Sequence, residues 1–119
     1  MIPLSQYIEE KIYALNQLDG EIQRMRGIAA LSDPEQTAVQ LQVVENLQTA
    51  RNLSDRRLFD LYILRNALWA TPDVIVQAEE AWKELCEAWD NAIALGGEFS
   101  SGSAIRIGQL LNTEDHERP

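Results

Sequence analysis

The sequence predicts an all-α fold: an elongated bundle of three long helices followed by a short C-terminal helix. Apolar residues recur at steps of three or four along three long stretches, which is the spacing of one helical face. The four prolines lie near the start of each stretch or at the chain end, where they do not interrupt a helix. At 119 residues, 45% of them hydrophobic, the chain is long enough for one domain with its own core.

The first long helix is expected over residues 3–30. Pro3 suits the first turn, because the N–H that proline lacks has no helical partner there. Gly20 lies inside the stretch and weakens the helix by about 1 kcal/mol relative to alanine. The apolar stripe consists of Ile8, Ile12, Leu15, Leu18, Ile22, Met25 and Ala29.

The second helix is expected over residues 34–70, and between its two ends there is neither proline nor glycine. At its start either Ser32 or Asp33 can serve as the N-cap, and Ser32 with Glu35 fits a capping box. One apolar stripe stays in phase across the middle of the stretch, which favours a single helix, continuous or merely kinked. The alternative is a break near Ser54, where serine would cap a new helix, so that the bundle would have four long helices.

The third helix is expected over residues 72–95. Pro72 follows a threonine, so the start signal of the second helix returns here, and Gly96-Gly97 supplies the residue type that ends helices beyond their C-terminus. Trp82 and Trp89 are two turns apart on the apolar arc of this helix. The arc consists of Val74, Ile75, Ala78, Trp82, Leu85, Trp89, Ala92 and Ile93. We therefore expect both tryptophans in the core.

We divide the chain into four parts. Residues 1–95 form the helical bundle, and residues 96–103 are read as a Gly/Ser-rich linker. Residues 104–111 are expected to form a short helix that docks on the bundle, although such a tethered apolar segment could instead bind a partner. Residues 112–119 are a polar tail that we expect to be disordered.

Residues 56–70, RRLFDLYILRNALWA, carry apolar side chains on more sides of a helix than the other helices, with one apolar stripe each, can cover. A helix of this kind has to be covered from more than one side. A second copy of the chain or another protein would provide the missing cover, and a two-fold dimer is the simplest closed arrangement. The candidate interface residues are Leu58, Phe59, Tyr62, Ile63, Leu64 and Trp69.

The third helix also carries a row of acidic residues, Glu79, Glu80, Glu84, Glu87 and Asp90. Pairs of carboxylates three residues apart share one helical surface and could hold a divalent metal. The row resembles the acidic motifs of helical nucleoside-triphosphate pyrophosphohydrolases, and the resemblance implies a metal-dependent nucleotide hydrolase. Most of the row lies opposite the apolar arc, however, so we expect these side chains to face water.

No other residue pattern predicts catalysis. His116 lies in the polar tail, and Cys86 lies at the edge of the apolar arc without a neighbouring histidine, so it is read as a small buried hydrophobe. We expect no catalytic residue, no metal, no cofactor and no small-molecule ligand. The lone cysteine and the absence of a signal-like or membrane-length apolar run lead us to expect a cytoplasmic protein.

The net charge of −9 is unevenly distributed. Residues 1–50 carry 7 acids against 3 bases and residues 71–119 carry 10 against 3, whereas residues 51–70 carry 4 bases against 2 acids. Arg51 with Asp55 and Arg56 with Asp60 are four residues apart, and we expect each pair to form an ion pair within the helix. Phosphates would repel so acidic a chain, so nucleic acid and anionic membranes are not expected partners. The sequence favours a non-catalytic subunit, adaptor or assembly factor, and the alternative is a small acidic inhibitor or chaperone that occupies a basic surface.

Overall fold

The computed structural model describes residues 4–64, 72–100 and 102–112. They form α1 (Leu4–Ala30), α2 (Pro34–Leu64), α3 (Pro72–Ile93), a 3₁₀ turn, η1 (Gly97–Ser100), and α4 (Gly102–Leu111). No strand occurs within these ranges, and the molecule extends over 54 × 27 × 18 Å. The predicted elongated all-α bundle is therefore confirmed, with three long helices and a short C-terminal one.

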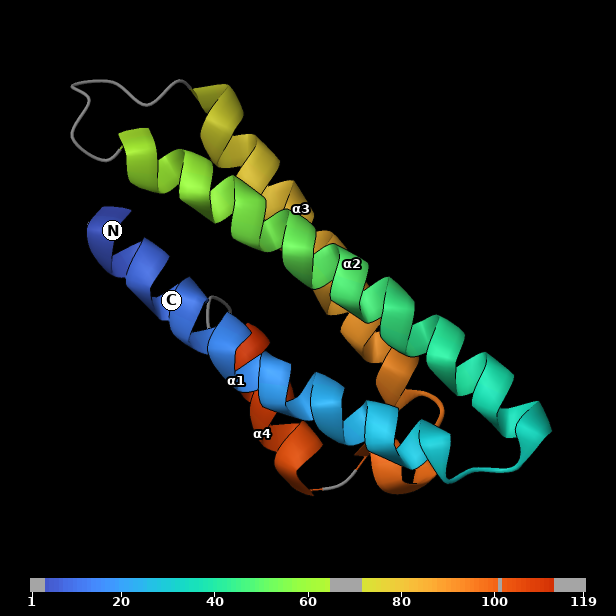
Figure 1. The fold of residues 1–119 in the computed structure, drawn as a ribbon. Coiled ribbons are helices and arrows are strands. Elements are labelled where there is room, and N and C mark those ends of the chain that lie inside the picture. Colours follow the sequence, from blue (N-terminus) through green and yellow to red (C-terminus); the bar gives the residue numbers. More distant parts are fainter. Residues whose placement is uncertain (1–3, 65–71, 101, 113–119) are drawn as a thin grey trace.

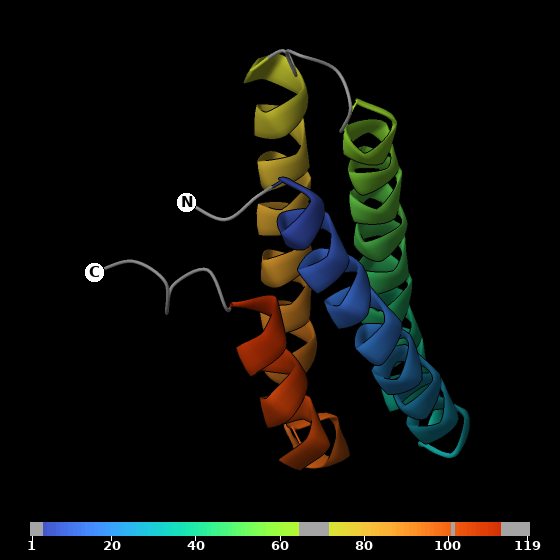
Figure 2. The same ribbon diagram turned by 90° about the vertical axis from the view of Figure 1, so that its left-hand side faces the viewer.

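The three long helices run up and down, with α2 packed against both α1 and α3 (Figure 1). The short α4 folds back and packs against α1 and α3 on the side away from α2 (Figures 1 and 2). The helix α1 crosses the α2–α3 pair obliquely (Figure 2). No helix in the described ranges is both long and apolar enough to cross a membrane.

The connection between α1 and α2 decides between the two N-cap residues that the sequence offered, Ser32 and Asp33. The Ser32 hydroxyl donates to the backbone carbonyl of Ile28 at 2.9 Å, so Ser32 satisfies a carbonyl at the end of α1. The first residue of α2 is Pro34, which places Asp33 in the N-cap position and Ser32 one residue too early for a capping box with Glu35. The predicted capping box of Ser32 with Glu35 was therefore wrong, whereas the alternative N-cap, Asp33, and the predicted helix start are confirmed.

The helix α2 passes through Ser54 without a break and continues to Leu64. Ser54 is buried, and it lies seven residues, or two turns, beyond the buried Leu47 on the same face of the helix. Burial of one continuous face on both sides of Ser54 holds the helix together, so the alternative of a chain reversal there is wrong. The rest of the predicted second helix, residues 65–70, lies outside the described residues.

The core lies between the helices and α4. Trp82 and Trp89 are 5% and 3% exposed, which confirms the register assigned to the third helix. Lys11 is also buried, with its ammonium nitrogen 4.2 Å from the centroid of the Trp82 ring, a cation–π arrangement. The largest fully buried side chains include Phe99, Leu15, Leu18, Ile22, Met25, Leu47, Leu61, Leu85 and Leu111.

The segment read as a linker is packed against this core. Gly96 and Gly97 have positive φ angles of 72° and 57°, which non-glycine residues rarely adopt, and they turn the chain as the sequence predicted. Directly after them, η1 inserts Phe99 into the core with 1% of its surface exposed. The indole N–H of Trp82 donates to the backbone carbonyl of Leu111 at 2.8 Å and fixes the end of α4.

Candidate functional site

Three of the candidate interface residues form an exposed apolar surface at the end of α2. Phe59 and Ile63 are each 59% exposed, and Tyr62 is 45% exposed. They are three and four residues apart, which places them side by side on one part of the helix. The rings of Phe59 and Tyr62 stack with their centroids 6.5 Å apart. We call Phe59, Tyr62 and Ile63 the α2 apolar surface.

The other three candidates do not belong to this surface. Leu58 is only 2% exposed and contributes to the core of the chain itself. Leu64 is the last residue of α2, and its side chain is outside what the structure describes. Trp69 also lies outside the described residues.

The path of α1 explains why this part of α2 is open. Over its C-terminal half, α1 is tied to α2, since Arg26 bonds Glu45 at 2.5 Å and Arg51 bonds Asp19 at 2.8 Å. Towards the N-terminal end of α1, the Lys11 side chain reaches α3, where its ammonium nitrogen lies over the Trp82 ring. The helix α1 therefore moves away from α2 along its length, as Figure 2 shows.

The position of Tyr62 on α2 follows from this divergence. Tyr62 lies eleven residues, or about three turns, beyond Arg51, so the two side chains share one face of α2. At Arg51 that face contacts α1 through the ion pair with Asp19. Three turns further on, Tyr62 lies on the same face and is 45% exposed. The apolar surface thus begins where α1 stops covering α2.

Exposed apolar residues also occur at the start of α3, which lies at the same end of the molecule (Figure 1). Ile75 is 36% exposed and Val76 is 47% exposed. The sequence placed Ile75 within the apolar arc of the third helix, and its partial exposure was not expected. Periodicity identifies the face of a helix that is apolar, but it does not show how far a neighbouring helix extends along that face.

The charges around the α2 apolar surface nearly balance. Asp55 lies 3.7 Å from Arg51, as the helical spacing predicted, whereas Asp60 lies 3.7 Å from Arg57. Arg56, which the sequence paired with Asp60, is exposed and has no ion pair among the described residues. Such exposed pairs contribute about 0–1 kcal/mol each to stability, but they keep this region free of the negative excess carried elsewhere.

The acidic row of α3 faces water. Glu79, Glu80, Glu84, Glu87 and Asp90 are all exposed. Within residues 4–64, 72–100 and 102–112, no three histidine, cysteine, aspartate or glutamate side chains come together in a way that could hold a metal ion. Cys86 is half-buried, with its sulfur 3.8 Å from the Leu111 carbonyl oxygen, and His116 lies outside the described residues.

The described residues thus offer an apolar surface at one end of α2 and an acidic row along α3, and both were foreseen from the sequence as features of single helices. Comparisons with protein-family models, with curated proteins and with solved structures find no match for this chain.

Proposed function

We propose that this chain is a non-catalytic protein-interaction subunit that binds through the α2 apolar surface, and that a second copy of the chain is the partner. The observation that carries the proposal is the exposure of Phe59, Tyr62 and Ile63 as one contiguous group on α2. Aromatic residues of this kind are enriched at the centres of protein interfaces, where they bury a large area at a small cost in side-chain entropy.

The charges around the α2 apolar surface favour it over the more acidic parts of the molecule as the contact between two copies. Residues 51–64 carry Arg51, Arg56 and Arg57 against Asp55 and Asp60, while the whole chain carries −9. The repulsion between two negatively charged copies is therefore smallest when they meet through residues 51–64.

The exposed acidic row of α3 favours a second candidate, an acidic inhibitor or chaperone that occupies a basic target. Binding through Glu80, Glu84, Glu87 and Asp90 would weaken strongly as salt is added, because exposed charges are screened. Binding through the apolar surface would not weaken in this way. Salt dependence therefore separates the two functions.

The experiment is light scattering of the purified chain and of a Phe59→Ser, Ile63→Ser double variant at equal micromolar concentration. The wild-type chain is expected to be a dimer, and the double variant a monomer with unchanged helical circular dichroism. Both side chains are exposed in the single chain, so their replacement should alter its stability by no more than about 0.5 kcal/mol.

The matched control is Ile105→Ser on α4, because Ile105 is 62% exposed and lies outside the proposed interface. This variant should remain a dimer. Equal dissociation of both variants would show that general surface hydrophobicity drives association, and a dimeric double variant would remove the α2 apolar surface from the account.

A further inference from the structure

Ile12 belongs to the apolar stripe of α1, but the fold leaves it partly open. Helical spacing placed this residue in the core with the rest of the stripe. Ile12 is 39% exposed, whereas the other members of the stripe are at most 2% exposed: Ile8, Leu15, Leu18, Ile22, Met25 and Ala29. The described helices of a single chain therefore do not cover the apolar stripe of α1 at Ile12.

The ion pair between Asp19 and Arg51 shows on which side of α1 Ile12 lies. Through this pair, Asp19 contacts α2 at 2.8 Å. Ile12 comes seven residues, or two turns, before Asp19, so the two side chains share one face of α1. Ile12 therefore lies on the α2 side of α1, towards the end where the two helices diverge (Figure 2).

Ile12 and the α2 apolar surface also lie at the same level along the bundle. The helices α1 and α2 run in opposite directions (Figure 1), so residues before Asp19 lie beside residues after Arg51. At about 1.5 Å per residue, Ile12 lies about 10 Å from Asp19 along its helix, and Phe59 and Tyr62 lie about 12–17 Å from Arg51 along theirs. Exposed apolar side chains of two neighbouring helices thus occur together.

The exposed apolar residues of α3 lie on a different side of α2. The side of α2 that faces α3 includes Ala50, which lines one groove together with Ala88 of α3. Phe59 comes nine residues, or two and a half turns, after Ala50, so it lies on the opposite side of α2. Val76 at the start of α3 is 47% exposed, but α2 separates it from Phe59.

The α2 apolar surface alone is too small for a stable dimer. A standard interface buries about 800 Å² on each partner. A fully covered aromatic side chain buries about 150–250 Å². Phe59 and Tyr62 are 59% and 45% exposed, so part of that area is already buried within the chain. With Ile63, they supply well under half of a standard interface, so a stable interface has to extend beyond α2.

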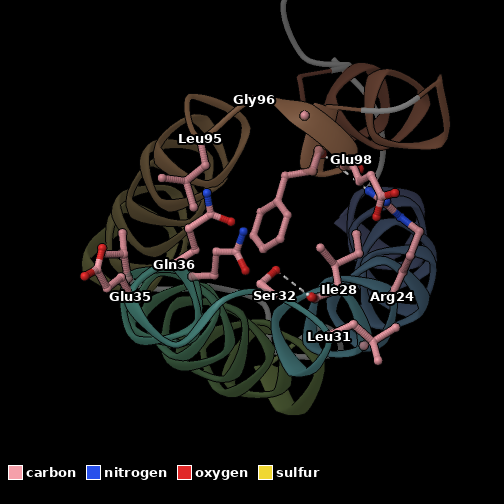
Figure 3. Close-up of a pocket in the computed structure, with 14 residues that line it drawn as sticks. Arg24, Ile28, Leu31, Ser32, Glu35, Gln36, Leu95, Gly96 and Glu98 are labelled. Carbon is pink, nitrogen blue, oxygen red and sulfur yellow. Dashed lines mark hydrogen bonds between the residues drawn. The ribbon is translucent and has the colours of Figure 1, made fainter.

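The opposite end of the bundle does not supply the missing apolar area. An open cavity of about 930 Å³ lies there, where α1 ends, α2 begins and α3 turns into η1. Leu31 and Leu95 are exposed at this end, but the lining also includes Ser32, Glu35 and Gln36 (Figure 3). Apolar and polar side chains are mixed around the cavity, so its lining is not a continuous apolar surface.

The charges on the exposed side of α1 allow a second copy to approach. Ser5 and Asn16, seven residues before and four residues after Ile12, lie on the same side as Ile12 and are exposed and uncharged. Glu9 is rotated by nearly a quarter turn from Asp19 about the helix axis, away from α2. The negative charge of Asp19 is paired with Arg51.

From the exposure of Ile12, its level beside the α2 apolar surface and the area that a dimer needs, we infer that the dimer interface spans α1 as well as α2. The second copy buries Ile12 together with Phe59, Tyr62 and Ile63, and the exposed start of α3 stays outside the interface. The inference rests on the proposed function and deepens it, since it names the helix onto which the interface extends.

The test compares dimer dissociation constants, measured by sedimentation equilibrium at one salt concentration, for the wild-type chain, Ile12→Ser and the matched control Val76→Ser. Ile12→Ser should weaken the dimer about tenfold or more, because apolar burial is lost at two positions in each dimer. Val76→Ser should stay within about twofold of the wild type, although Val76 is the more exposed of the two residues.

A second substitution guards against loss of folding. Alanine has the highest helix propensity, so Ile12→Ala preserves α1 while it removes the exposed part of the side chain. This variant should weaken the dimer about fivefold or more, with unchanged helical circular dichroism. If Ile12→Ser loses helical structure, Ile12→Ala decides the question.

The inference and the proposed function fail separately. If both Ile12 variants dimerise as tightly as the wild type while the Phe59→Ser, Ile63→Ser variant is a monomer, the inference is overturned and the proposed function stands. If Val76→Ser weakens the dimer as much as Ile12→Ser, the interface extends onto α3 and the inference is again overturned. A monomeric wild-type chain would overturn the proposed function and the inference with it.

Discussion

Ser54 is a polar residue at a position that the fold uses as core. Its side chain is 1% exposed, and its hydroxyl has no hydrogen-bond partner among the described residues. A helix interior offers serine little advantage, because alanine has the higher helix propensity. Ser54 therefore lowers the stability of the fold slightly. Its replacement by alanine provides a direct test of whether α2 is continuous.

Ser54→Ala should raise the free energy of unfolding by about 1 kcal/mol, because it removes an unsatisfied buried hydroxyl and improves helix propensity. Urea unfolding followed by circular dichroism measures this change. If Ser54 instead capped a new helix, the same substitution would lower stability by about 0.5–2 kcal/mol. The sign of the change therefore distinguishes the continuous helix from the broken one.

At the residue scale, the sequence predicted positions that depend on one helix alone. Trp82 and Trp89 share a stripe with the other apolar residues of α3, so their burial follows from periodicity. The burial of Lys11 does not, because it depends on the Trp82 ring of another helix lying 4.2 Å from the ammonium nitrogen. The same limit explains why Leu58 was grouped with Phe59, although one is buried and the other exposed.

At the element scale, the segment after Gly97 closes the bundle. Its composition, rich in glycine and serine, is typical of a linker, but Phe99, Ala104, Ile107 and Leu111 are all buried. A high glycine and serine content predicts that a segment is flexible in isolation. In the folded chain, burial of the single aromatic ring of Phe99 is enough to hold the segment against the core. The short helix was predicted because its apolar residues were too many for a free tail.

Phe99→Ala should lower the free energy of unfolding by about 3–5 kcal/mol, since it removes a fully buried ring and leaves a cavity. Denaturant unfolding measures the loss. The matched control is Ile105→Ala in the adjacent α4, where the side chain is 62% exposed and the expected change is within about 0.5 kcal/mol. Similar small effects for both variants would show that the segment behaves as an unpacked linker.

The candidate site was predictable to the extent that it belongs to one helix. The excess of apolar residues in the second helix is visible in the sequence, and the structure leaves Phe59, Tyr62 and Ile63 exposed there. The cavity at the other end was not predictable, since residues from Arg24 to Phe99 line it and only the packing of three helices brings them together.

At the scale of the whole molecule, the α2 apolar surface favours self-association and the net negative charge opposes it. The helix α2, with 31 residues, is the longest of the elongated bundle, and its apolar surface lies near one end. Burial of that surface against a second copy favours a dimer, whereas two bodies that each carry −9 repel one another. Added salt screens the repulsion and leaves the apolar contact, so the dimer should tighten as salt rises.

Sedimentation velocity of the wild-type chain over a range of micromolar concentrations tests the central claim most directly. At about 0.02 M salt, where screening extends over roughly 20–30 Å, a reversible monomer–dimer equilibrium is expected. At about 0.3 M salt the boundary should shift towards the dimer at every concentration. A strict monomer at both salt concentrations would contradict self-association through Phe59, Tyr62 and Ile63, and a dimer that dissociates as salt rises would assign the contact to charged surfaces instead.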